Sequence, residues 1–264
     1  MTYRYFIKIS YDGYGFLGSQ KQPNNRTVYG ELELALNGLF KQCLRCVPCG
    51  RTDAGVHAQV SWCHCDFNFK FDPSHVMPSL NHALIPKGII VRQLFQVSKD
   101  VHALSSAASR SYAYYFTCDH EIPNYLLHSV THVDKPLMFV PTNQDLASLF
   151  TGKRNFFSLC NIGSASVTTI RDIHSMSLSR LTYETLFRNS VEIYCFQIVA
   201  NAFLYKMVRH IVGILLHSMM NFTNMSRLYD YLIVHRPIAY SLAPPRGLHL
   251  TDVDYNNDTK VVKS

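Results

Sequence analysis

The sequence of 264 residues has few charged residues and no long uninterrupted apolar segment. Charged residues make up 16% of the chain, against 47% hydrophobic and 12% aromatic residues, which excludes an intrinsically disordered protein. The 12 glycines and 11 prolines are too few for a collagen-like or low-complexity chain. The most apolar stretch, 204–220, contains Lys206, Arg209 and two histidines, which excludes a membrane-spanning helix there.

The N-terminal residues alternate between polar and apolar, and they lack the apolar core of a secretory signal. We therefore expect a cytoplasmic protein with no membrane partner. Lys and Arg number 25 and Asp and Glu number 18, which gives a formal net charge of +7. This balance favours an anionic partner such as nucleic acid.

Five of the eight cysteines lie close together in the sequence, at Cys43, Cys46, Cys49, Cys63 and Cys65. Such a cluster suggests zinc, but its second pair is Cys-x-Cys and not the Cys-x-x-Cys of a standard finger. We favour small, buried, reduced cysteines on adjacent strands and expect no metal site. A zinc-stapled nucleic-acid module is the alternative.

Apolar periodicity predicts an α+β protein with a mostly antiparallel sheet, because predicted strands largely follow one another. The strand at 3–11 is expected to be half-buried. Predicted strands cover 3–11, 44–49, 62–69, 89–96, 110–117, 173–179, 191–200 and 247–255. Predicted helices cover 27–42, with Thr27 as N-cap, 142–152, with a capping box, and 204–219; 73–86 is a loop or short helix. The chain is expected to divide into two halves, 1–105 and 106–264, although no linker marks the boundary. The two halves have a similar order of predicted strands and helices.

The stretch Gly50–Ala58 holds the most informative polar cluster of the sequence. Two glycines bracket a single carboxylate, Asp53, in a tight loop that leaves a strand. Composition alone favours a hairpin turn with a surface ion pair here.

The string Arg51-Thr52-Asp53-Ala54-Gly55-Val56-His57 resembles the signature of the tRNA pseudouridine synthase A family. The resemblance covers nearly the whole chain. Further matches are Tyr11-Asp12-Gly13, Phe16-x-Gly18-x-Gln20, Asn81-x-Ala83-Leu84-x-Pro86, Val101-His102-Ala103, Arg110-x-Tyr112-x-Tyr114, Ala200–Leu204, Met207–Gly213, Gly247-Leu248-x-Leu250 and Val253-Asp254-Tyr255.

This resemblance implies a pseudouridine synthase fold, in which two ferredoxin-like halves form an extended sheet around a central cleft. It implies an isomerase that converts uridine to pseudouridine at positions 38–40 in the anticodon arm of tRNA, with no cofactor and no catalytic metal. It also implies a homodimer that binds tRNA.

The resemblance assigns roles to single residues. Asp53 matches the essential aspartate, which acts as a nucleophile or as a base at C2′, and the residues leave both open. Arg209 matches the arginine that pairs with this aspartate. Tyr112 matches the tyrosine that stacks on the flipped uracil and assists proton removal at C5, and Arg51 the arginine that enters the RNA stem.

Arg110 and His57 complete the predicted RNA-binding residues, while Tyr114 and Phe116 are predicted to be core aromatics. The sequence departs from the family pattern at Ser19, usually tryptophan, at Val60-Ser61, and at Leu104, usually arginine. The Ser19 change predicts altered packing near the cleft. The departures at Val60-Ser61 and Leu104 motivate the alternative of a pseudouridine synthase with another RNA target. A catalytically silent tRNA-binding factor is a further alternative, and the joint presence of Asp53, Tyr112 and Arg209 argues against it.

Overall fold

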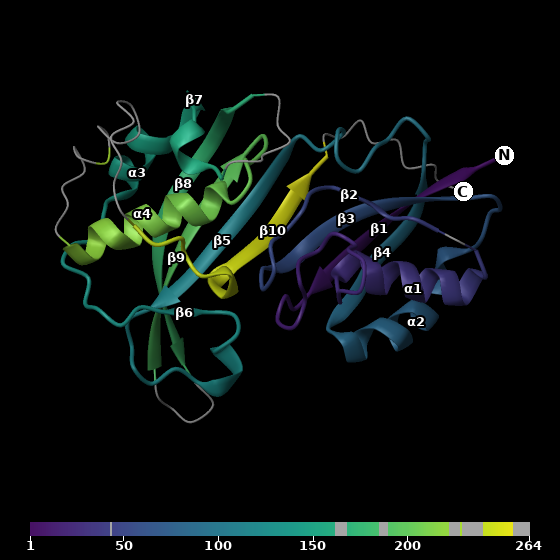
Figure 1. Cartoon of the computed structure of the whole chain (residues 1–264), viewed down its shortest axis with the longest axis horizontal. Helices are drawn as coiled ribbons and strands as arrows, with labels where there is room; N and C mark the ends of the chain where they lie inside the picture. Colours follow the sequence, from purple (N-terminus) through teal and green to yellow (C-terminus); the bar gives the residue numbers. More distant parts are fainter. Residues whose placement is uncertain (43, 162–167, 185–189, 222–227, 229–239, 256–264) are drawn as a thin grey trace. The chain divides into compact units, whose positions relative to one another are not determined.

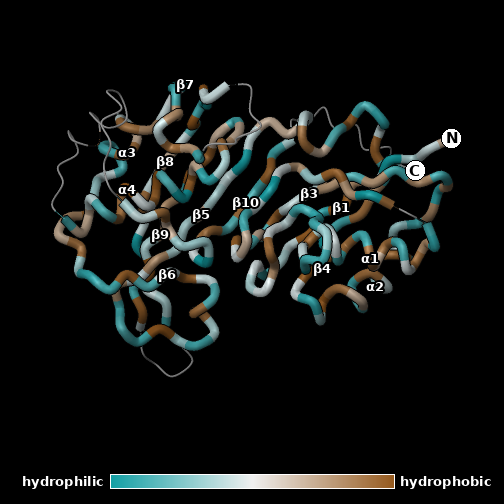
Figure 2. The backbone as a smooth tube through the Cα atoms, in the orientation of Figure 1, coloured by the Kyte–Doolittle hydropathy of each residue, from teal (hydrophilic) through white to brown (hydrophobic). Residues whose placement is uncertain are grey.

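The computed structural model describes residues 1–42, 44–161, 168–184, 190–221, 228 and 240–255. They form two compact units, one made of Met1–Ser109 with the C-terminal stretch from His249, the other of Arg110–Leu248. Each unit combines helices with a mostly antiparallel sheet, which confirms the predicted α+β class (Figure 1). Hydrophobic residues recur along the strands and helices of each unit (Figure 2).

The first unit has the strand and helix order of a ferredoxin-like fold. Its elements are β1 (Tyr3–Tyr11), α1 (Val28–Phe40), β2 (Val47–Pro48), β3 (His57–Phe67), α2 (Pro73–Leu84), the 3₁₀ turn η1 (Ile85–Lys87), β4 (Ile89–Val97) and, from the end of the chain, β10 (Leu248–Asp254). β1 lies between β4 and β3 and is antiparallel to both, and β2 is antiparallel to β3. β10 pairs in parallel with β3, His249 opposite His57, although the sequence prediction groups the last strand with the C-terminal half.

β1 is buried on both faces, so the expectation of a half-buried strand is wrong. On one face Tyr5 and Ile7 are 1% and 0% exposed. On the other face Phe6 is 3% exposed, and its ring lies 6.0 Å from that of Trp62 and 5.5 Å from that of Tyr255. Part of this cover comes from the far end of the chain, which a local pattern does not reveal.

The segment predicted as a loop or short helix is the full helix α2. The side chain of Asp72 accepts a hydrogen bond from the amide of Ser74 at 2.9 Å and so caps the first turn. Pro73 occupies the first helical position, where its missing N–H has no intrahelical partner to lose. Pro73 therefore begins the helix and does not interrupt it. α1 begins directly after Thr27, as predicted.

The second unit repeats the order of strand, helix, strands and helix. Its elements are β5 (Ser109–Thr117), η2 (Asn124–Leu126), β6 (Thr131–His132), α3 (Asn143–Phe150), β7 (Gly152–Asn155), η3 (Phe157–Leu159), β8 (Ile170–Glu184), β9 (Ser190–Ala200), α4 (Met207–Asn221) and η4 (Pro245–Gly247). The sheet order is β5-β9-β8-β7, antiparallel throughout, with the short β6 parallel to β5.

Local sequence signals in the second unit are confirmed. Thr142 and Asp145 form the predicted capping box at the start of α3. The predicted apolar stripe of α4 is buried, with Val208, Ile211 and Leu215 at most 5% exposed. Within the part of the chain that the structure describes, no helix has the length and apolarity needed to cross a bilayer.

An ion pair across β1 and β3 gives a pH-dependent test of the first unit. Arg4 lies opposite Asp66, and two of its nitrogens donate to the two carboxylate oxygens at 2.8 Å each. These bonds lower the pKa of the Asp66 carboxyl below its ordinary value. Because the folded-state pKa is the lower one, the stabilisation is present above the unfolded pKa of about 4 and is lost as the pH falls through the folded pKa.

We therefore expect Asp66→Asn to lower the free energy of unfolding by about 0.5–1 kcal/mol at pH 7, as is typical of a partly exposed pair. The difference from the wild type should shrink as the pH falls below about 4. Urea unfolding can be followed by the fluorescence of Trp62, the one tryptophan of the sequence, which is buried in β3. A difference that stays constant down to pH 2.5 would contradict this role of the pair.

Candidate active site

The loop Gly50–His57, here called the signature loop, connects β2 to β3 in the first unit. β2 and β3 are antiparallel, so the connection is a hairpin, as composition alone suggests. The segment that follows β1 packs closely against it. A Cβ atom on Gly13 would lie 2.2 Å from the carbonyl oxygen of Val56, and one on Gly18 would lie 3.0 Å from that of Thr52. Glycine is therefore required at Gly13 for this close backbone approach.

Thr52, the residue before Asp53, is held at three of its atoms. Its amide donates to Oγ of Ser19 at 2.8 Å, and its carbonyl oxygen accepts from the amide of Ser19 at 3.1 Å. Its hydroxyl lies 2.7 Å from that of Tyr11. Because Ser19 is only 1% exposed, water does not compete for these bonds. The backbone that leads into Asp53 is thereby fixed.

Asp53 itself is half-buried, and its carbonyl oxygen accepts from the amide of Val56 at 3.2 Å, closing a tight turn. Gly55 within this turn has a φ of 78°, in the left-handed region that favours glycine. The glycine that follows the carboxylate residue in the signature loop thus serves a specific backbone path. This path presents the side chain of Asp53 from a fixed turn.

His57 ends the signature loop and begins β3 with its side chain buried. It is 5% exposed, and its ring stacks on that of His249 at 4.5 Å. The amide of Gly13 lies 3.1 Å from Nδ1. Oδ1 of Asp12, 3.1 Å from Nδ1, accepts from the amide of Tyr14 at 2.9 Å. These contacts favour a supporting role, and RNA binding by His57 stays a prediction.

Two of the three tyrosines of β5, Tyr112 and Tyr114, differ in their surroundings. Tyr112 is half-buried, and its ring meets that of Phe203 edge to face at 5.1 Å. Tyr114 is fully buried, and its hydroxyl lies 2.8 Å from that of Thr131 and donates to the carbonyl of Pro244 at 3.0 Å. Burial raises the pKa of Tyr114 to about 12. Tyr114 is therefore a core residue, as predicted, and Tyr112 is the better placed to meet a ligand.

Arg209 lies on α4, half-buried, and is anchored to the segment that follows the helix. Its Nε donates to the carbonyl of Ala243 at 2.8 Å, and its own carbonyl accepts from the amide of Ala243 at 3.2 Å. Gly213, one turn further along, permits this approach, since a Cβ atom there would lie 2.4 Å from the carbonyl oxygen of Ser241. The anchor fixes the plane of the guanidinium, as a two-pronged bond to a carboxylate requires.

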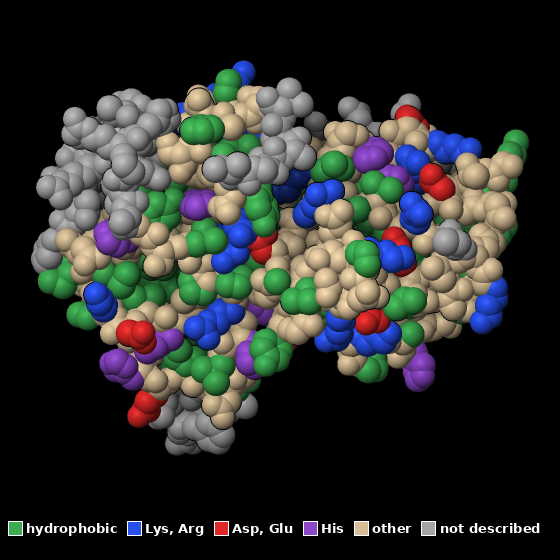
Figure 3. Space-filling model, in the orientation of Figure 1, with side chains coloured by type: hydrophobic (Ala, Val, Ile, Leu, Met, Phe, Trp, Pro, Cys, Tyr) green, Lys and Arg blue, Asp and Glu red, His purple; other side chains and the backbone are tan. Residues whose placement is uncertain are grey.

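The remaining RNA-contact candidates differ in exposure. Arg51 is exposed on the signature loop, whereas Arg110 is half-buried and donates to the carbonyl of Asn201 at 2.9 Å. Leu104, which replaces the arginine typical of the family, is 51% exposed in the first unit. On the face drawn in Figure 3, Lys and Arg side chains are scattered over each unit and form no single stripe.

Asp53, Arg51 and His57 thus belong to the first unit, and Tyr112, Arg110 and Arg209 to the second. Within the first unit the three residues share the signature loop. Their combination with the other three in one site, and the central cleft itself, stay predictions of the resemblance.

Sequence reasoning missed two residues that position the candidate site. Ser19 was interpreted as a packing change, whereas its hydroxyl and amide both bond to the signature loop. Gly213 was noted only as part of a motif, whereas it admits the segment that anchors Arg209. A glycine inside an otherwise apolar helix was the available signal, because such a glycine usually has a packing reason.

Comparison with known proteins shows which family the chain belongs to, which the geometry alone does not. A family model described as tRNA pseudouridine synthase matches residues 146–256. A protein named tRNA pseudouridine synthase A from a Geobacillus species is 32% identical over 97% of this chain and 100% of its own length. Proteins of the same name from Treponema denticola and Limosilactobacillus reuteri are 35% and 32% identical, over 96% and 98% of this chain and 92% and 99% of their own. The chain therefore belongs to the tRNA pseudouridine synthase A family, whose members are isomerases that act on uridine in tRNA.

Proposed function

We propose that this protein converts uridine to pseudouridine in tRNA, at positions 38–40 of the anticodon arm. The main support for this proposal is the way in which the signature loop holds Asp53. Its carboxylate residue, Asp53, follows a threonine whose amide, carbonyl and hydroxyl are all hydrogen-bonded to the protein. A reacting group held at a fixed position is what efficient catalysis requires, since orientation alone lowers a reaction barrier by several kcal/mol.

The reaction is an isomerisation and needs no oxidant or co-reactant. The bond between C1′ and N1 breaks, the base turns, and a bond forms between C1′ and C5. The hydrogen on C5 leaves as a proton, and N1 gains one. Asp53 either attacks C1′ as a nucleophile or takes a proton from C2′, and both steps use an ionised carboxylate.

The second unit would supply the groups that surround the flipped base. Tyr112 offers a half-buried ring for stacking and a hydroxyl near C5, while Tyr114 is committed to the core. Arg209 would hold Asp53 through a two-pronged bond. Because the target base leaves the RNA stack, exposed Arg51 can fill the space it vacates.

The recognition of tRNA would depend on shape and phosphate contacts more than on base sequence, in keeping with the net charge of +7. The proposal includes a homodimer in the cytoplasm. Two alternatives remain: another RNA target, favoured by exposed Leu104 in place of an arginine, and a silent tRNA-binding factor.

The loss of the Asp53 carboxylate tests the proposed chemistry. Wild-type protein should release tritium to water from unmodified tRNA transcripts that carry 5-tritiated uridine, because bond formation at C5 expels that hydrogen. Asp53→Asn should release none and should still bind the tRNA. Binding without release by the wild type, over a panel of transcripts, would favour the silent binding factor.

The hydroxyl of Ser19 is predicted to act on the reaction rate and not on binding. Ser19→Ala leaves the buried amide of Thr52 without its acceptor, which costs on the order of 1–3 kcal/mol and loosens the signature loop. We expect kcat for tritium release to fall roughly tenfold or more, with KM for tRNA little changed.

Ser61→Ala is the matched control, because Ser61 is also buried and hydrogen-bonded, to Tyr29 at 2.8 Å, but lies within β3. Equal loss of kcat in the two variants would show a general loss of stability and would contradict the role of Ser19.

An arginine restored at Leu104 tests whether this surface meets RNA. Leu104→Arg should tighten tRNA binding and should steepen the fall of log K with log salt by roughly 0.7–0.9, the effect of one added phosphate contact. Leu34→Arg is the control, because Leu34 is also an exposed leucine of the first unit but lies elsewhere, on α1. The same gain in both variants would mean that added charge acts at any position, and would contradict a specific contact at Leu104.

A further inference from the structure

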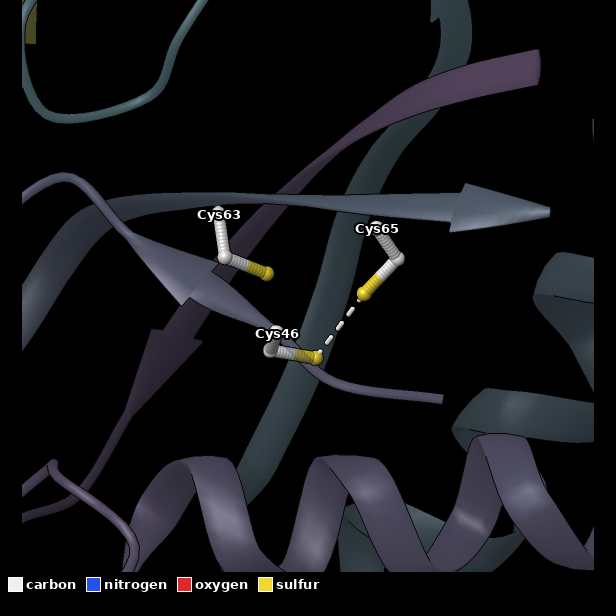
Figure 4. Close-up of side chains that lie close together, drawn as sticks. All are labelled: Cys46, Cys63 and Cys65. Carbon is white, nitrogen blue, oxygen red and sulfur yellow. Dashed lines mark hydrogen bonds between the residues drawn. The ribbon is translucent and has the colours of Figure 1, made fainter. Parts of the chain in front are cut away.

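Three cysteines of the first unit, Cys46, Cys63 and Cys65, bring their sulfur atoms close together. The sequence alone does not indicate which of the five cysteines between Cys43 and Cys65 do so. Cys63 and Cys65 are two residues apart on β3 and point to the same face. Val47 of β2 lies opposite His64, so Cys46, one residue earlier, lies opposite Cys65. The three sulfur atoms lie within 4.8 Å of one another, and those of Cys46 and Cys65 are 3.0 Å apart (Figure 4).

The convergence takes place in the interior. Cys63 and Cys65 are 0% exposed and Cys46 is half-buried, which confirms the expectation of buried cysteines on adjacent strands. The amide of Cys46 donates to Oε1 of Glu33 at 2.9 Å, which fixes the strand that carries this thiol. Figure 4 shows all three sulfur atoms directed toward a common point.

The thiols also differ in acidity. Burial raises the pKa of Cys46 and Cys63, whereas hydrogen bonds from these two thiols lower the pKa of Cys65 to about 6. A thiolate is the form in which cysteine binds metal ions.

We propose that Cys46, Cys63 and Cys65 form a three-thiolate site for a thiophilic cation of filled d shell, Zn²⁺ or Cu⁺. Metal–sulfur bonds of about 2.3 Å place the sulfur atoms about 3.8–4.0 Å apart. The sulfur atoms of Cys46 and Cys65, 3.0 Å apart, would need to separate by about 0.8–1.0 Å, and no two of the three sulfur atoms are more than 4.8 Å apart, so side-chain movements of about an ångström reach this spacing. Soft thiolate ligands select these ions over Mg²⁺ or Ca²⁺.

The two ions differ in what else they need. Cu⁺ can be coordinated by three thiolates alone, whereas Zn²⁺ takes a fourth ligand. A water molecule could supply this fourth ligand from the side of Cys46, which is half-buried. Cys43 lies outside the described residues. Cys49 is a separate buried thiol, whose sulfur accepts a hydrogen bond from the amide of Trp62 at 3.3 Å.

The site would join β2 to β3, the two strands that the signature loop connects. An ion bound there would join the two strands at the base of this hairpin. Its effect would be on the stability of the first unit and not on the chemistry of the reaction. The inference thus stands apart from the proposed function.

The test uses the whole reduced protein, purified without oxygen and freed of metal. Wild type should bind one equivalent of Zn²⁺, or of Cu⁺ supplied with a competing chelator, and Co²⁺ should give the sulfur-to-metal charge-transfer absorption of thiolate ligands. Cys65→Ser and Cys63→Ser should each weaken binding at least 100-fold. Cys195→Ser, at a buried thiol of the second unit, should bind as the wild type does.

A second measurement needs no variant. Metal should protect Cys46, Cys63 and Cys65 together from alkylation under mild denaturant, as read by mass spectrometry of the labelled peptides. Binding by wild type no stronger than by the Cys63→Ser/Cys65→Ser double variant would overturn the proposal. So would a disulfide between Cys46 and Cys65 in the anaerobic protein, since it would leave one thiol only.

Discussion

The candidate site depends on one set of contacts, the hydrogen bonds that join Thr52 to Ser19 and Tyr11. Without them, the signature loop would be a hairpin connection with a carboxylate on a mobile turn. With them, the loop is held from the side of β1, a strand that is buried on both faces. The close approach at Gly13 serves the same end, because no larger residue lets the backbone come near enough to make these bonds. A loop of small and polar residues thereby gains the order of the sheet beneath it.

In the second unit, a helix holds a candidate site residue in place. Arg209 is a long, flexible side chain, and its bond to the backbone of Ala243 removes much of that freedom. Tyr112 is positioned by the antiparallel pairing of β5 with β9, opposite Ile198. In the first unit, therefore, a chemically capable side chain lies on a loop, and in the second such side chains lie on a strand and a helix; contacts with a neighbouring segment restrain Asp53 and Arg209.

Signals that act over a few residues were read correctly from the sequence. The capping box at Thr142 is set by neighbouring residues and occurs where the sequence predicts it. Thr27 precedes α1 as predicted, but its side chain makes no capping hydrogen bond. Features set by distant residues were not predicted. The cover that Tyr255 gives to Phe6, and the pairing of His249 with His57, join the two ends of the chain. The cluster at Cys46 likewise depends on the register of β2 against β3, which spacing does not specify. Candidate residues such as Asp53 came from a resemblance, and the structure adds what supports each of them within its own unit.

The central claim is that the signature loop serves pseudouridine formation in the anticodon arm, and mapping of the product tests it most directly. Unmodified tRNA transcripts with uridines at positions 38, 39 and 40, and at other positions, would be incubated with the protein, treated with carbodiimide and read by primer extension. The account predicts new stops at one or more of positions 38–40 and at no other position. Stops confined to another part of the tRNA, or no stops with any transcript, would contradict it.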